Sequence, residues 1–152
     1  MANRLEYSTT AHCKPEHVWA KFEKLEEWAR GNSVIGAASW IEGDRWQKGG
    51  RFFFQLMKPR VMRFKPVMIE SRPPHRVAWV GTAPGFKGEH WFSFEAQPDG
   101  TTLLKTWEDF SGLVTVFFGP GTRRRLVAMY QAWLEALKAE AEKVALAEHA
   151  RT

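Results

Sequence analysis

Cysteine is almost absent from this sequence. Cys13 is the only cysteine in 152 residues, which excludes an intramolecular disulfide and a metal cluster held by thiolates. Histidine is also sparse, and the spacing of the five histidines does not fit a set of metal ligands. We therefore expect neither a metal site nor another cofactor.

Long apolar runs are missing as well. No segment approaches the length that a membrane-spanning helix needs, so stable membrane insertion is not expected. The first six residues, MANRLE, lack the apolar core of a signal peptide. Together with the lone cysteine, these absences predict a cytoplasmic protein.

Signatures of nucleic-acid binding are absent, although the net charge is +5. The sequence contains no helix-turn-helix pattern, zinc-finger spacing or aromatic and basic RNA-binding run, so no nucleic-acid partner is expected. Basic residues cluster only at 123–125 and, more loosely, at Lys58, Arg60, Arg63 and Lys65. We interpret both clusters as solvated surface, with a surface facing an anion or a lipid headgroup as the alternative.

Aromatic residues, in contrast, are abundant. They make up 14% of the chain, with 8 Trp and 11 Phe, which is more flat apolar surface than a small core needs. The length fits one domain, here residues 1–152. The aromatic residues therefore fill a core or line a ligand cavity, since cavities are walled mainly by such side chains.

The first part of the chain predicts one strand followed by helix. Residues 4–11 alternate between apolar and polar, and Pro15 is tolerated in the first turn of a helix. Apolar residues then recur at helical spacing to about Arg30, which predicts one helix or two short ones.

The middle of the chain changes to strand-like alternation. Candidate strands span residues 34–41, 51–57, 61–70, 76–82, 89–96 and 102–110. Turn residues separate them, and connections this short join only antiparallel neighbours. The middle therefore predicts an antiparallel meander.

A long helix is expected at the end of the chain, from Thr122 as N-cap to about Glu148. Its apolar residues recur every three or four positions, and about 26 residues span roughly 39 Å. Such a helix must pack on the meander. The predicted fold is α+β, with a curved antiparallel sheet of about seven strands around the long helix and two short helices after the first strand.

Four segments carry a resemblance to a known superfamily. They are residues 15–19 (PEHVW), 73–81 (PPHRVAWVG), 88–94 (GEHWFSF) and 108–113 (EDFSGL). In this order they resemble the SRPBCC superfamily, also described as START-like or polyketide cyclase/dehydrase and lipid-transport-like. The resemblance covers nearly the whole chain and implies a helix-grip fold with a cavity for a small hydrophobic ligand. It implies no single activity, because the superfamily contains carriers, cyclases and regulators.

Alternation also predicts which side chains face the cavity. If Phe92 and Phe94 point inward, His90 does too. A register with Leu104 opposite Phe94 places Thr106 opposite Phe92 and Glu108 opposite His90. The expected ligand-binding residues are Phe54, Val77, Trp79, Phe92, Phe94, Leu104, Thr106, Phe110, Tyr130, Trp133 and Leu137.

The same register turns Trp91 and Trp107 outward. Outward tryptophans indicate a homodimer contact or a register that is wrong by one residue.

His90 and Glu108 form the one polar pair expected inside the cavity, with three interpretations. They act as a general acid and base, form a satisfied buried hydrogen bond, or hold the polar end of a ligand. The predicted function is binding of a small hydrophobic or amphipathic ligand such as a lipid, fatty acid or aromatic polyketide. The alternatives are an aromatase/cyclase enzyme and a protein-interaction module.

Overall fold

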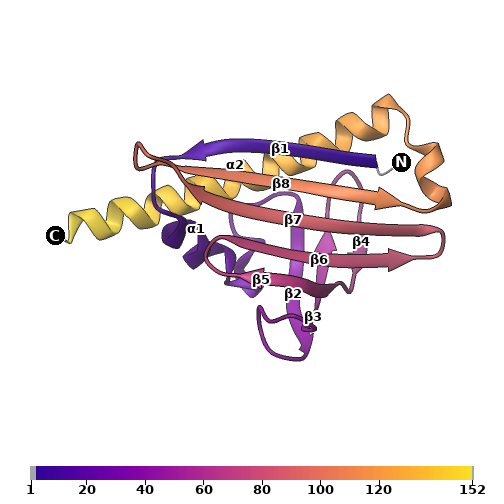
Figure 1. Ribbon diagram of the computed structural model, residues 1–152, viewed down its shortest axis with the longest axis horizontal. Helices are drawn as coiled ribbons and strands as arrows, with labels where there is room; N and C mark the ends of the chain where they lie inside the picture. Colours follow the sequence, from indigo (N-terminus) through magenta and orange to yellow (C-terminus); the bar gives the residue numbers. More distant parts are fainter. Residues whose placement is uncertain (1–2, 152) are drawn as a thin grey trace.

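The computed structural model describes residues 3–151 (Figure 1). Residues 1, 2 and 152, which the predicted domain includes, lie outside the described residues. The elements in chain order are β1 (Asn3–Ala11), α1 (Pro15–Phe22), the 3-10 helix η1 (Leu25–Glu27), β2 (Ile35–Glu42), β3 (Arg51–Leu56), β4 (Met62–Phe64), β5 (Val67–Arg72), β6 (Arg76–Ala83), β7 (Phe86–Ala96), β8 (Thr102–Ser111), the 3-10 helix η2 (Leu113–Phe117) and α2 (Pro120–Ala150).

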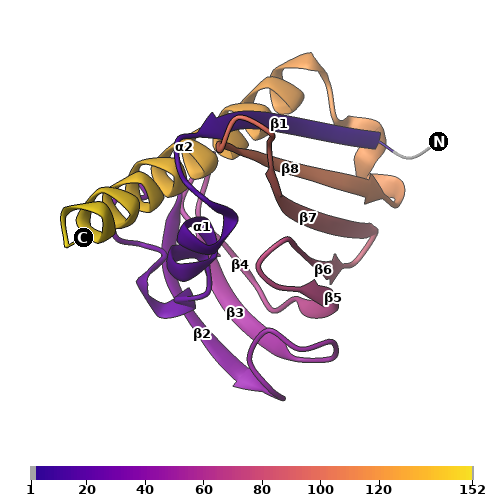
Figure 2. The same cartoon turned by 60° about the vertical axis from the view of Figure 1, so that its left-hand side comes forward.

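The strands form one antiparallel sheet of eight strands, in the order β1-β8-β7-β6-β5-β3-β2, with β4 paired to β3. The first strand therefore lies beside the last, with Tyr7 opposite Thr106. The sheet curls, and α1 and α2 lie on its concave side (Figure 2). This arrangement confirms the predicted helix-grip fold.

The single strand expected at residues 61–70 is divided into β4 and β5. Pro66 lies between them, and proline has no N–H group to donate to a neighbouring strand. The division brings the sheet to eight strands.

Helix α2 begins earlier than expected. Gly119 is the N-cap and Pro120 lies in the first turn, so the prediction of Thr122 as N-cap is wrong. Proline is favoured at this position because its missing N–H group would have no partner there. The helix has 31 residues, about 46 Å at 1.5 Å per residue, and is long enough to cross the whole sheet.

Aromatic side chains fill one half of the concave side. Phe22 lies with its ring centroid 4.9 Å from that of Phe92 and 5.2 Å from that of Trp28. The indole N–H of Trp28 donates to Phe22 O at 2.7 Å, and that of Trp46 donates to Glu23 O at 2.8 Å. These bonds satisfy the indoles of Trp28 and Trp46, and the packed rings form the aromatic core of the protein.

The outer face carries a pair of stacked tryptophans. The rings of Trp91 and Trp107 are 5.6 Å apart and inclined by 3°. Arg76 lies over Trp91 at 5.5 Å, and Arg4 lies over Trp107 at 5.8 Å. The outward orientation is the one that the sequence register predicts, so the register is not displaced by one residue.

The described part of the chain gives no sign of a membrane-spanning helix, since none of its helices combines the necessary length and apolar character. Within residues 3–151, no three His, Cys, Asp or Glu side chains group as metal ligands would.

Candidate ligand cavity

A cavity of about 560 Å³ lies in the other half of the concave side, between the sheet and the first half of α2. Its wall is mostly apolar and comes from β3, β4, β6, β7, β8, η2 and α2. The apolar side chains of the wall are Phe54, Leu56, Pro59, Met62, Phe64, Pro66, Trp79, Ala83, Pro84, Phe86, Phe110, Val114, Phe118, Leu126, Met129 and Trp133.

Six of the residues that the sequence predicts for the ligand site are in the wall of this cavity. They are Phe54, Trp79, His90, Glu108, Phe110 and Trp133. The first five belong to strands β3, β6, β7 and β8, and all five side chains point to the concave side because they follow the alternation of the sheet.

The other expected residues are not part of the wall of this cavity. They are buried residues outside the wall: Val77, Phe92, Phe94, Leu104, Thr106, Tyr130 and Leu137. Alternation identifies the concave face correctly, but it does not say where along each strand the space is empty. The strand residues among them lie toward α1, where Phe22 packs against Phe92 and Phe94.

Several wall residues escaped the sequence analysis. Strand β7 begins at Phe86, three residues earlier than expected, so Phe86 and Gly88 share the face of His90. Leu126 and Met129 belong to the apolar side of α2, about two turns and one turn before Trp133. Both groups could have been found by extending the same periodicities. The wall residues of η2 and of the β3–β4 connection could not, because they follow no period.

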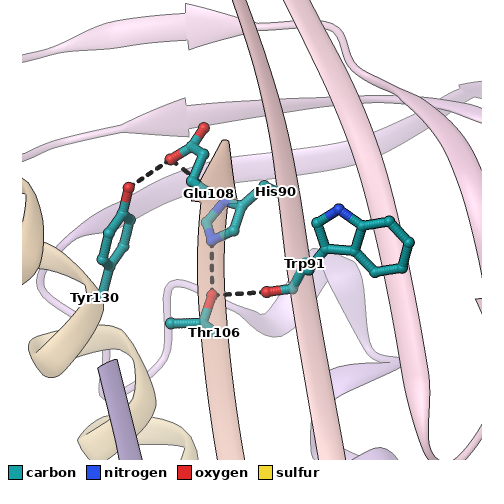
Figure 3. Close-up of polar contacts among 5 residues, drawn as sticks. All are labelled: His90, Trp91, Thr106, Glu108 and Tyr130. Carbon is teal, nitrogen blue, oxygen red and sulfur yellow. Dashed lines mark hydrogen bonds and ion pairs between the residues drawn. The ribbon is translucent and has the colours of Figure 1, made fainter. Parts of the chain in front are cut away.

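Glu108 carries a carboxyl group into the cavity from β8 (Figure 3). The Tyr130 hydroxyl of α2 donates a hydrogen bond of 2.7 Å to its Oε1. A Cβ atom at Gly88 would lie 2.9 Å from Glu108 Oε2, so glycine leaves room for this carboxyl group. Burial raises the pKa of Glu108 to about 7, although the Tyr130 hydrogen bond lowers it.

His90 is held by a second hydrogen-bond chain. Thr106 Oγ1 donates its proton to Trp91 O at 2.9 Å, so it accepts from His90 Nε2, which lies 2.8 Å away. The proton of the imidazole is therefore on Nε2, and Nδ1 has a free electron pair. Burial lowers the pKa of His90 to about 3, so the ring is neutral at neutral pH.

The two side chains lie close together without a direct hydrogen bond. His90 Nδ1 is 3.9 Å from Glu108 Oε1, which is beyond hydrogen-bonding distance (Figure 3). Near pH 7, Glu108 can donate or accept a proton, while the Nδ1 of His90 can only accept a hydrogen bond. The cavity thus contains one titrating group and one fixed acceptor.

Residues 3–142 match the family described as polyketide cyclase / dehydrase and lipid transport. The chain belongs to this family. Membership suggests binding of a hydrophobic ligand or cyclase activity, and the apolar cavity is consistent with both. Among curated proteins, none matches this sequence.

Solved structures support the same fold. A hypothetical protein from Helicobacter pylori is similar with a TM-score of 0.78 and 17% identity, over 91% of this chain and 88% of that protein. A START superfamily protein from Mycobacterium smegmatis has a TM-score of 0.76 and 13% identity, over 93% and 98% of the two chains. The Zhui aromatase/cyclase from a Streptomyces species has a TM-score of 0.73 and 17% identity, over 94% and 95%. At these identities the similarity shows the fold alone.

Proposed function

We propose that the protein binds one small amphipathic molecule in the cavity. The observation that carries this proposal is the cavity itself, of about 560 Å³, whose interior is apolar except for His90 and Glu108. The apolar body of the ligand packs against Trp79, Trp133 and Phe54. A neutral polar group of the ligand bonds to Glu108, which can act as donor or acceptor near pH 7.

Burial of apolar surface supplies the affinity. Each 100 Å² of apolar ligand surface removed from water contributes about 2.5 kcal/mol, against which the cost of association must be set. The polar group at Glu108 contributes orientation, because an unpaired group in the apolar interior would be costly.

Filling the cavity tests the proposal. Gly81 lies in the wall, and the nearest atom to a Cβ built there is Phe64 Cδ1 at 3.9 Å, so a larger side chain fits without backbone strain. Because side chains alternate along β6, a leucine at this position enters the cavity with Trp79 and Ala83. Thr82→Leu is the matched control, since Thr82 is exposed and points to the other face.

We expect the neutral fluorescent probe N-phenyl-1-naphthylamine to bind the unmodified protein and Thr82→Leu alike. Gly81→Leu should bind it at least tenfold more weakly, with an unchanged circular dichroism spectrum. Equal binding by Gly81→Leu, or no binding by the unmodified protein, would show that the cavity is not a ligand site.

A second candidate function is catalysis of a ring closure or dehydration in the same cavity. The specific observation that favours it is the buried carboxyl group of Glu108, 3.9 Å from His90 Nδ1, because burial raises the pKa of Glu108 to about 7 and keeps His90 neutral. A carboxyl group with such a pKa suits general acid and base catalysis at neutral pH. A cyclase would lose turnover in Glu108→Gln while it still bound the neutral probe, whereas a carrier has no turnover to lose.

A further inference from the structure

The wall residues that are exposed to solvent identify the mouth of the cavity. They come from the β3–β4 connection and the start of β4, the end of β6 and the β6–β7 turn, η2 and the first turns of α2: Pro59, Arg60, Met62, Ala83, Pro84, Val114 and Arg125. In Figure 1 the β6–β7 turn, η2 and the start of α2 lie together at the right-hand end. The cavity is therefore open to solvent at this end of the sheet.

Two arginines are part of this mouth. Arg60 and Arg125 are the basic side chains of the wall, and both are exposed. Within residues 3–151, neither forms an ion pair with a carboxylate. Other arginines of the chain are paired, for example Arg45 with Glu26 at 2.7 Å. The positive charge at the mouth is thus not neutralised by the protein.

The first turns of α2 change from polar to apolar along the cavity wall. Thr122 and Arg125 lie at the mouth, followed on the same side of the helix by Leu126, Met129 and Trp133. The N-terminus of α2 has no side-chain cap, so the positive end of its dipole adds to the charge of Arg125.

The acidic group of the wall, Glu108 of β8, lies beside a later turn of α2 than Arg125 does. Tyr130, which holds Glu108, is five residues beyond Arg125, about 7.5 Å of helix rise. Among the described residues, Glu108 is the one carboxylate of the wall. The cavity is therefore cationic at its mouth and acidic inside, and an anionic group is favoured at the mouth and repelled from the interior.

We propose that the natural ligand is an anionic amphiphile, with a carboxylate or phosphate contacted by Arg60 and Arg125 at the mouth, its apolar part in the cavity and its neutral polar group at Glu108. This inference rests on the proposed function, because it concerns the ligand of the same cavity. It adds the charge and the orientation of that ligand.

The test measures how well ten-carbon amphiphiles displace N-phenyl-1-naphthylamine: decanoate, decyl phosphate, decan-1-ol and decylamine. The variants are Arg60→Gln and Arg125→Gln. Matched controls are Arg63→Gln and Arg124→Gln, because Arg63 and Arg124 are exposed neighbours outside the wall and also lack an ion pair with a carboxylate within residues 3–151. All four single variants change the net charge equally.

We expect decanoate or decyl phosphate to bind more tightly than decan-1-ol, and decylamine most weakly. Each wall variant should weaken the anionic amphiphile about two- to fivefold, and the double variant about tenfold, as for exposed ion pairs. Of decanoate and decyl phosphate, the one whose binding the wall variants weaken more carries the preferred anionic group. Added salt should reduce the difference in affinity between the unmodified protein and the wall variants.

Two results would overturn the inference. One is equal binding of the anionic and neutral amphiphiles. The other is an equal loss in the control variants, which would show a general effect of net charge. In either case, displacement of the probe by decan-1-ol would leave the proposed function intact. Failure of the probe to bind would contradict both the proposed function and this inference.

Discussion

Replacing Glu108 by glutamine removes the titrating carboxyl group of the cavity wall and keeps an oxygen that accepts the Tyr130 hydrogen bond. Burial raises the pKa of Glu108 to about 7 in the folded protein, from an ordinary value of 4.5. Between pH 4.5 and pH 7 the folded state therefore binds more protons than the unfolded state. The contribution of Glu108 to the free energy of unfolding is complete below pH 4.5 and is lost as the pH rises through 7.

The size of this loss follows from the pKa difference. One pKa unit corresponds to 1.36 kcal/mol, so the difference between 4.5 and about 7 amounts to roughly 3 kcal/mol. For a protein of this length, 1 kcal/mol moves the melting temperature by about 2 to 4 °C. Because glutamine does not titrate, the melting temperature of Glu108→Gln relative to the unmodified protein should rise by about 6 to 12 °C between pH 4.5 and pH 8.

Differential scanning calorimetry of both proteins from pH 4.5 to pH 8 measures this difference. His90 also titrates differently on unfolding, because burial lowers its pKa to about 3, so its contribution is lost as the pH falls below 6.5. His90 is present in both proteins, and its effect cancels in the comparison. A difference in melting temperature that stays constant with pH would refute the argument that Glu108 is held in an apolar environment.

Two further predictions concern the neighbours of this site and the outer face. Tyr130→Phe removes the hydrogen bond that lowers the pKa of Glu108, so the pH dependence described above should move to higher pH in the same calorimetric series. Trp107→Ala removes the ring stacked on Trp91 and should cost about 1 kcal/mol in urea unfolding without changing probe affinity; a loss of probe binding would connect the outer face to the cavity.

The pairing of β7 with β8 could be predicted because a short turn joins two strands with clear alternation. His90 lies opposite Glu108 and Phe94 opposite Leu104, as expected from the sequence. The same alternation placed Trp91 and Trp107 outside. For neighbouring strands, local periodicity therefore determines which residues meet.

The position of the empty space could not be predicted in this way. It depends on which part of the concave face is filled by the segment after β1 and by the β2–β3 connection. Phe22, Trp28 and Trp46 of these segments reach the sheet only through long-range packing. The hydrogen bond from Tyr130 to Glu108 could not be predicted either. Helical spacing places its side chain in the interior, but the contact with Glu108 requires the helix position relative to the sheet. The mouth escaped prediction because its loops have no periodic pattern.

Native mass spectrometry of the gently purified protein, before and after addition of decanoate, decan-1-ol and N-phenyl-1-naphthylamine, tests the central claim most directly. The cavity predicts complexes with one bound molecule for the unmodified protein and Thr82→Leu, and their loss in Gly81→Leu. Complexes that persist equally in Gly81→Leu, or none in the unmodified protein, would contradict ligand binding in this cavity.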